Sequence, residues 1–267
     1  MYKAVVSDLD GTLLNGNHAI DEFTKEIVSE VINRGIKFYI ATGRSYSGAK
    51  DIMDKLGLKI PLITSNGARI LDEEGNEIYV NNLEKKYSDS ILDIDYKKKG
   101  KSIVLNVYSG NDWYVTEDRR EFYMKINPKR TFFPEVTTLE ELKTKEFTKI
   151  FFLGEHDELL ELEKEIENIT KGEVNIAFVL EHCLEIFSKE SDKANAARFL
   201  LEKDGLTLKD SVAFGDGCND YNLLKEAGKG YVMGNALYRL KEALPENETV
   251  ETNADNGVAK KLVELFL

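Results

Sequence analysis

Residues 3–12 read KAVVSDLDGT, a short apolar run followed by two carboxylates and a glycine. The apolar run predicts a buried strand, and the acidic pair lies where that strand should end. In open parallel sheets, ligands bind beyond the carboxyl ends of the strands. Gly11 permits a turn at this point, so Asp8 and Asp10 can both face one pocket.

Two carboxylates in this arrangement suit phosphoryl chemistry. A carboxylate can attack phosphorus and form an acyl phosphate. A second carboxyl can protonate the leaving oxygen and then activate water, which contributes about 10²–10⁴-fold to the rate. The alternative for residues 8–12 is a capped strand-end turn, the usual meaning of an isolated Asp-Gly pair. The complete five-residue string favours catalysis, because a chance match is expected roughly once in several hundred chains of this length.

Strand-like and helical runs alternate on both sides of a different middle section, which predicts an α/β fold with a mainly parallel sheet. The first part is expected to contain strands 3–7, 36–41 and 61–64, helices 21–34 and 49–56, and a hairpin over 69–80. The last part is expected to contain strands 211–214, 230–233 and 249–252 and helices 192–203, 219–227, 236–244 and 256–266.

The middle section reads as a separate α+β unit of a sheet plus two helices. Its pattern predicts helices over 87–99 and 159–169 and strands over 102–108, 113–116, 147–153, 174–180 and 184–187. The predicted architecture is therefore a discontinuous core domain, residues 1–82 and 189–267, interrupted by an inserted α+β domain, residues 83–188.

A second acidic motif, GDGCND at residues 215–220, also follows a predicted strand and opens a helix. Asp216 and Asp220 at a strand end suit Mg²⁺, a hard cation that prefers oxygen ligands. The alternative is a glycine turn with Asn219 or Asp220 as the helix cap. Taken together with residues 8–12, the metal interpretation is favoured.

Two shorter signals fit the same site. Thr42-Gly43-Arg44 follows the second strand, and a hydroxyl with free backbone N–H groups can hold phosphate oxygens there. Lys193 begins the helix after the insertion, where a cation is badly placed for the helix macrodipole. Neutralising a phosphoryl group would explain that position. Each signal alone has a simpler alternative, a small-residue turn for the first and an exposed helical lysine for the second.

Composition limits the partners. The 267 residues carry a net charge of −12 and the sequence pI is about 4.9, which disfavours nucleic acid and anionic membranes. With two cysteines and three histidines, neither a disulfide framework nor a zinc site is expected. The first residues lack signal-peptide features and no stretch is apolar enough to span a bilayer, so a cytoplasmic location is expected.

The order of these motifs resembles the haloacid dehalogenase superfamily, and within it the Cof-type phosphatases with a C2B cap. The resemblance spans essentially the whole chain and includes MGNA at 233–236 and TNADNGVA at 252–259. It implies a doubly wound, Rossmann-like core with an inserted cap domain. The sequence departs from the family pattern at Ala194, where Gly often follows the lysine, and at Asn256, where Asp is common.

The resemblance also implies roles for individual residues. Asp8 would be the nucleophile and Asp10 the general acid/base. The magnesium ligands would be Asp8, Asp216 and the backbone carbonyl of Asp10. The expected phosphate-binding groups are the Leu9 backbone, Thr42, Gly43, Lys193 and Asn219. Asp220 would order the loop or support the metal shell, and Arg44 is a candidate for contact with substrate or cap.

The implied function is Mg²⁺-dependent hydrolysis of small phosphorylated metabolites, such as sugar phosphates or phosphorylated cofactors, by a monomer or small homo-oligomer. The alternatives are a phosphomutase or phosphotransferase on the same scaffold, a phospho-aspartate signalling module, and a catalytically inactive binding module. The cap would contact the leaving group, for which the aromatic candidates are Trp113, Tyr114, Phe132 and Phe133. Packing within the cap is the alternative for each of them.

Overall fold

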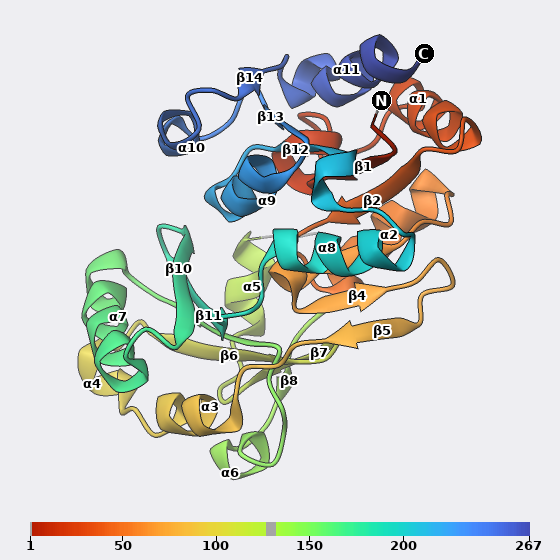
Figure 1. Cartoon of the computed structure of the whole chain (residues 1–267). Coiled ribbons are helices and arrows are strands. Elements are labelled where there is room, and N and C mark those ends of the chain that lie inside the picture. The colour runs from red at the N-terminus through yellow and green to blue at the C-terminus, as the bar shows by residue number, and fades with distance from the viewer. Residues whose placement is uncertain (1, 127–131) are drawn as a thin grey trace. The chain divides into compact units, whose positions relative to one another are not determined.

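The computed structural model describes residues 2–126 and 132–267, and it divides the chain into two compact units. Unit 1 consists of Met1–Val80 and Ser191–Leu267, and unit 2 consists of Asn81–Glu190. Each unit has its own sheet (Figure 1). Each unit also has its own apolar core. The chain therefore leaves unit 1 after its fifth strand, builds unit 2, and returns to complete unit 1.

Unit 1 contains an eight-stranded sheet in the order β14-β13-β12-β1-β2-β3-β4-β5. The first six of these strands are parallel to one another, whereas β4 pairs antiparallel with both β3 and β5. The strands are β1 (Ala4–Ser7), β2 (Lys37–Ala41), β3 (Leu62–Thr64), β4 (Arg69–Leu71), β5 (Glu77–Val80), β12 (Ser211–Gly215), β13 (Lys229–Val232) and β14 (Glu248–Thr249). This topology confirms the predicted α/β class with a mainly parallel sheet.

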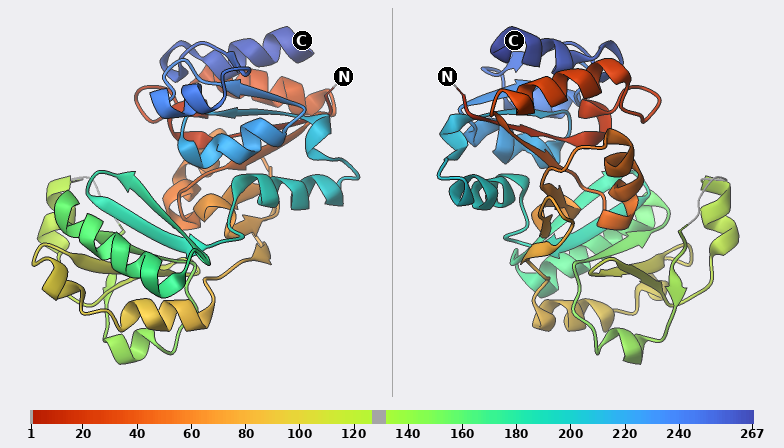
Figure 2. Two further views of the ribbon diagram at one scale, coloured as in Figure 1. Left: turned by 60° about the vertical axis from the view of Figure 1, so that its left-hand side comes forward. Right: turned by 90° about the vertical axis from the view of Figure 1, so that its right-hand side faces the viewer.

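Helices lie on both faces of this sheet. They are α1 (Glu22–Asn33), α2 (Tyr46–Leu56), α8 (Lys193–Lys203), α9 (Tyr221–Glu226), α10 (Tyr238–Ala243) and α11 (Gly257–Phe266). Helix α1 packs against α11 and α8 packs against α9, with the sheet between the two pairs (Figure 2). The arrangement is a doubly wound fold, in which the buried strands β1 and β12 lie at the centre.

Local sequence explains where these elements begin. Asp21 accepts a hydrogen bond from the Thr24 N–H (2.8 Å), as an N-cap residue does, and α1 starts at the next position. The expected hairpin over 69–80 is present, and its turn contains Gly75 at φ +84°. These boundaries follow from short-range chemistry, and the sequence predicted them.

Unit 2 contains a six-stranded sheet in the order β10-β11-β9-β6-β7-β8, antiparallel except for the β7–β8 pair. Its strands are β6 (Val104–Ser109), β7 (Asp112–Val115), β8 (Glu135–Val136), β9 (Lys149–Leu153), β10 (Val174–Leu180) and β11 (Cys183–Ser188). Its helices are α3 (Lys85–Leu92), α4 (Tyr96–Lys99), α5 (Arg120–Ile126), α6 (Leu139–Leu142) and α7 (His156–Thr170). Helix α7 packs against α3 and α4.

The expected single helix over 87–99 is wrong, because the structure divides it into α3 and α4. The break places Ile94 and Tyr96, which are 6% and 9% exposed, in the same apolar core as Ile91 and Leu92. Four such residues cannot all face one side of a continuous helix, since helical side chains rotate by a fixed angle per residue. The stabilisation from burying these four side chains outweighs the local preference for a continuous helix.

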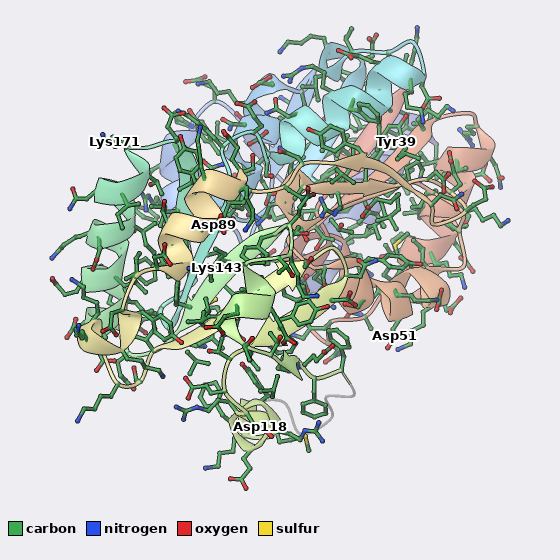
Figure 3. All side chains as sticks on the ribbon, turned by 90° about the horizontal axis from the view of Figure 1, so that it is seen from below. Tyr39, Asp51, Asp89, Asp118, Lys143 and Lys171 are labelled. Carbon is green, nitrogen blue, oxygen red and sulfur yellow. The ribbon has the colours of Figure 1, made fainter. Side chains whose placement is uncertain are left out.

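The surface carries many charged side chains, among them Asp51, Asp118 and Lys171, which are all exposed (Figure 3). Acidic residues outnumber basic ones, 48 to 36, which gives the chain its net charge of −12. Within the described residues, every helix is too short or too polar to cross a bilayer.

Candidate active site

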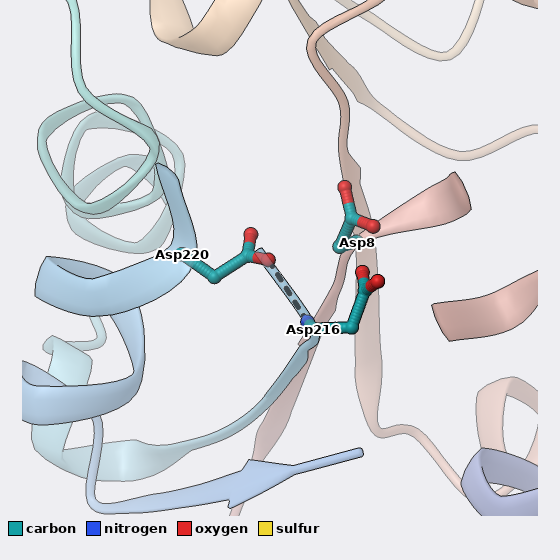
Figure 4. A group of neighbouring side chains, drawn as sticks. All are labelled: Asp8, Asp216 and Asp220. Carbon is teal, nitrogen blue, oxygen red and sulfur yellow. Dashed lines mark hydrogen bonds between the residues drawn. The ribbon is translucent and has the colours of Figure 1, made fainter. Parts of the chain in front are cut away.

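Two neighbouring strands bring the acidic motifs together. Strands β1 and β12 are parallel, and their register pairs Ser7 with Phe214, so both strands end at the same edge of the sheet. Asp8 follows β1 and Asp216 follows β12. Carboxylate oxygens of Asp8, Asp216 and Asp220 all lie within 4.8 Å of one another (Figure 4). Residues about two hundred positions apart thus form one acidic cluster at the carboxyl edge of the sheet.

Gly11 is required at this edge for two reasons. Its φ of +74° lies in the left-handed region, where residues with a Cβ are strained. A Cβ at this position would also lie 2.3 Å from Asp216 Oδ2. The neighbouring Thr12 hydroxyl donates to Asp216 Oδ1 (3.1 Å). The turn after β1 therefore both makes room for the Asp216 carboxylate and orients it.

Lys193 is the cation of the cluster. Asp192 accepts hydrogen bonds from the backbone N–H groups of Ala194 (2.7 Å) and Asn195 (3.2 Å), which starts α8 at this residue. The Lys193 side chain is 0% exposed, and its Nζ donates to Asp8 Oδ1 (2.5 Å) and to Asp220 Oδ1 (2.7 Å). The position that is unfavourable for the helix dipole is compensated by these two carboxylates.

Asp220 holds the second acidic loop in place. Its Oδ2 accepts hydrogen bonds from the backbone N–H groups of Asp216 (3.0 Å) and Gly217 (2.9 Å), while its Oδ1 accepts from Lys193. Both oxygens are therefore engaged within the protein. This pattern fits a residue that supports the loop and orients the lysine.

Burial perturbs the acid–base properties of the cluster. Burial raises the pKa of Asp8 to about 8, although Lys193 acts in the opposite direction, and nearby Asp220 adds to the rise. Burial, followed by the charge of Asp220, raises the pKa of Asp216 to about 6. Burial alone would lower the pKa of Lys193, but the carboxylates of Asp220 and Asp8 outweigh it and raise that pKa. The ammonium therefore stays charged.

The donor set of this cluster fits a divalent cation. The cluster contains three carboxylates and a single ammonium, which contacts two of them, so an excess of negative charge remains when all three are ionised. The hydrogen bonds from Lys193 and Thr12 engage Asp8 Oδ1 and Asp216 Oδ1. Among the described residues, no donor bonds to the second oxygen, Oδ2, of either carboxylate. These oxygens are hard ligands of the kind that Mg²⁺ prefers.

Asp10 occupies a different position from the other three aspartates. Its carboxylate forms a two-pronged pair with Arg44, from Nε to Oδ2 and from Nη2 to Oδ1, each at 2.6 Å. Arg44 also donates from Nη1 to the Gly48 carbonyl (3.0 Å). Arg44 is therefore paired with Asp10, and the expected contact of Arg44 with substrate or cap stays a prediction.

The expected phosphate-binding residues line the same edge. Thr42 is buried, and its Oγ1 accepts from the Arg44 N–H (3.1 Å), which leaves the hydroxyl proton for an anion. Asn219 is exposed, and its Nδ2 donates to Asn66 Oδ1 (2.9 Å). The Leu9 side chain is buried and anchors the turn after β1. Asn66 was not among the predicted site residues, although it follows β3 as the other motifs follow their strands.

Two further asparagines brace the turn that contains Gly11. Asn235 Nδ2 donates to the Gly11 carbonyl (2.7 Å), and the Asn253 N–H donates to Asn235 Oδ1 (2.9 Å). Asn253 Nδ2 donates to the Leu14 carbonyl (2.7 Å). Asn235 lies in the MGNA segment and Asn253 in the TNADNGVA segment, so one residue of each segment supports the first acidic motif. Their sequence alone gave no indication of that role.

The aromatic candidates of unit 2 differ in burial. Trp113 and Tyr114 are 4% and 6% exposed, and the Trp113 Nε1 donates to Asn106 Oδ1 (3.1 Å). Phe132 is 40% exposed and lies 6.1 Å from Trp113, measured between ring centroids. Phe133 packs against the cluster that contains Trp113. Packing within unit 2 accounts for the first two.

Comparison with known proteins gives consistent matches over the whole chain. A family model of haloacid dehalogenase-like hydrolases matches residues 5–262. A Buchnera aphidicola (subsp. Baizongia pistaciae) protein, provisionally named as a phosphatase, is 37% identical over 270 residues, covering 100% of this chain and 99% of the relative. The HMP-PP phosphatase of Yersinia pseudotuberculosis serotype O:1b is 32% identical over 262 residues, covering 98% of this chain and 94% of that protein. The crystal structure of a haloacid dehalogenase-like hydrolase from Bacteroides thetaiotaomicron is similar with a TM-score of 0.85, at 26% identity and 100% coverage of both chains.

Proposed function

We propose that this chain, which belongs to the haloacid dehalogenase-like hydrolases, is a magnesium-dependent phosphatase that acts on small phosphorylated metabolites through an aspartyl phosphate. The family match confirms the resemblance seen in the motifs. The observation that carries the mechanism is the buried Asp8 carboxylate at a strand end, held by Lys193 beside Asp216. The name of the Yersinia relative supports a small phosphorylated compound as substrate.

In the first half of the proposed reaction, an Asp8 carboxylate oxygen attacks phosphorus. A bond forms between that oxygen and phosphorus, and the bond from phosphorus to the leaving oxygen breaks. Asp10 donates a proton to the leaving oxygen, so the alcohol departs neutral. Phosphoryl transfer depends mainly on positioning and charge neutralisation, which Lys193, Thr42 and Asn219 would supply around the phosphoryl oxygens.

In the second half, Asp10 accepts a proton from water, and the water oxygen attacks phosphorus. The bond between Asp8 and phosphorus breaks, which regenerates the carboxylate and releases inorganic phosphate. Arg44 would keep Asp10 oriented between these two steps. Transfer of the phosphoryl group to a second hydroxyl, in place of water, would make the chain a mutase or transferase.

Asp8, Asp216 and the backbone carbonyl of Asp10 would hold the magnesium ion. When bound, it supplies positive charge that offsets repulsion between a carboxylate nucleophile and an anionic phosphate. Burial raises the pKa values of Asp8 and Asp216, and both carboxyls must be deprotonated to ligate a cation, so metal binding would compete with their protonation. Unit 2 would act as the cap that sets leaving-group specificity.

The first experiment is phosphate release from an aryl phosphate and a panel of phosphorylated metabolites, with Mg²⁺ supplied. We expect release that EDTA suppresses and added Mg²⁺ restores. Product analysis accompanies the assay, because isomerised product without free phosphate would identify a mutase. A chain inert toward every phosphoester in the presence of Mg²⁺ would contradict the proposal.

We also predict that Mg²⁺ stabilises the protein more strongly at pH 8.5 than at pH 6. Asp8 and Asp216, with pKa values of about 8 and about 6, must lose protons before they can ligate a cation. At about 100 times its dissociation constant, a ligand adds about 2.7 kcal/mol to the free energy of unfolding. At a pH two units below the pKa of a metal-ligating carboxyl, metal binding is about a hundredfold weaker. This removes most of the stabilisation by Mg²⁺.

Thermal unfolding measures this effect without any substrate. The control is KCl at matched ionic strength, which should not reproduce the shift. An equal shift in unfolding temperature at both pH values would show that these two carboxylates do not ligate the ion.

A further inference from the structure

The segment that follows β3 has an unusual backbone. Ser65 and Asn66 have φ values of +50° and +56°, and Gly67 follows at +97°. Consecutive non-glycine residues in the left-handed region are sparsely populated and persist only where the surroundings determine them. Such turns cluster at functional sites, so the contacts of the turn after β3 indicate its role.

This turn is tied to the loop after β2. The Ser65 N–H donates to the Arg44 carbonyl (2.8 Å), and the Asn66 N–H donates to the Thr42 carbonyl (3.0 Å). A Cβ added at Gly43 would lie 3.0 Å from Asn66 Oδ1, so the side chain of Asn66 packs directly on that glycine. The turn after β3 and the expected phosphate loop therefore form one hydrogen-bonded unit.

The same turn also contacts the other two motifs at this end of the sheet. Asn66 Oδ1 accepts from Asn219 Nδ2 (2.9 Å). A Cβ at Gly67 would lie 2.4 Å from the carbonyl oxygen of Asp192, the residue that caps the helix beginning at Lys193. The turn of residues 65–67 thus contacts the Thr42, Lys193 and Asn219 segments at once.

On this geometry, and resting on the proposed function, we infer that Asn66 is a positioning residue that directs the Asn219 amide toward the phosphoryl group. Asn219 is exposed, whereas Asn66 is only 6% exposed and can serve as its anchor. An amide nitrogen has two N–H donors. The bond to Asn66 uses one of them and fixes the plane of the amide, which leaves the second N–H for a phosphate oxygen.

Asparagine suits this position for two reasons that act together. It tolerates the left-handed backbone better than most residues, and its side chain supplies the acceptor that Asn219 needs. Glycine would retain the backbone and lose the acceptor. The Asn66→Gly variant therefore separates the two contributions.

The test is a double-variant cycle of Asn66→Gly and Asn219→Ala in the full chain. Two readouts are used: kcat and KM for an aryl phosphate, and the calorimetric affinity for inorganic phosphate. Asn66→Gly should weaken phosphate affinity and raise KM, about three- to tenfold, the usual size of one hydrogen bond. In the Asn219→Ala background, the same change should have less than about a twofold further effect, because the residues act through one contact.

The matched control is Asn256→Gly, which removes another asparagine side chain from a left-handed position, at φ +59°. It should leave both readouts unchanged. Multiplicative losses in the double variant, or wild-type phosphate affinity in Asn66→Gly, would overturn the inference. A wild-type chain that binds phosphate and hydrolyses no ester would instead overturn the proposed function, and the affinity cycle would still decide the role of Asn66.

Discussion

The Asp8→Asn variant is expected to release no measurable phosphate from an aryl phosphate while it folds normally. An amide has nearly the same shape as a carboxylate, but it cannot attack phosphorus to form an acyl phosphate. Removal of a catalytic nucleophile costs about 10⁴-fold or more in kcat in enzymes where it has been measured. The measurement is phosphate release at saturating substrate and Mg²⁺.

The same variant should be at least as stable as the wild type in the absence of metal at pH 8. Burial raises the pKa of Asp8 to about 8, above its value in an unfolded chain. The folded state therefore binds this proton more tightly, and stability falls as pH rises between the unfolded and folded pKa values. A neutral amide removes that loss, and Lys193 keeps Asp220 as its partner.

A suitable control for this variant is Asp51→Asn, which makes the same change at an exposed position on α2. It should retain activity and stability. Unchanged turnover in Asp8→Asn would remove this residue from the mechanism. Loss of folding would show that the carboxylate has a structural role that its raised pKa does not suggest.

The second large effect is expected for Lys193→Met, which replaces the buried ammonium with an apolar chain of similar length. The variant would leave the carboxylates of Asp8 and Asp220 buried without their cation. Breaking a buried ion pair by removing one partner costs about 3–5 kcal/mol. Activity should also fall, by about 10²–10³-fold, as for loss of one group that stabilises transition-state charge.

The stability loss in Lys193→Met should depend on pH in a defined direction. Without the ammonium, the remaining carboxylates bind protons more readily, and protonation relieves their repulsion. Urea unfolding in EDTA should therefore show a larger loss, relative to the wild type, at pH 8 than at pH 5. Lys203→Met, at the exposed end of the same helix, is the control. A stability loss independent of pH would indicate a packing defect and not unpaired charge.

The local sequence pattern was sufficient to predict some of the secondary structure. The capping of α1 by Asp21 and the turn at Gly75 depend on contacts between near neighbours, and both were predictable. The helix expected over 87–99 was not, because its break depends on the burial of Ile94 and Tyr96 in a core built from distant strands. Helix α5 was also missed, since its short segment has little apolar periodicity.

The sequence by itself determined the fold class and the acidic groups at its strand ends. Residues 8–12 and 215–220 each follow a buried strand, and parallel strands place their carboxyl ends on one edge. Only the tertiary structure decided which side chains bond there: Arg44 to Asp10 across 34 positions, Asn219 to Asn66 across 153, and Lys193 to Asp8 across 185. Those partners depend on strand register and helix packing, which set distances within tenths of an ångström. The raised pKa values have the same origin, because burial is a property of the assembled core and of no single segment.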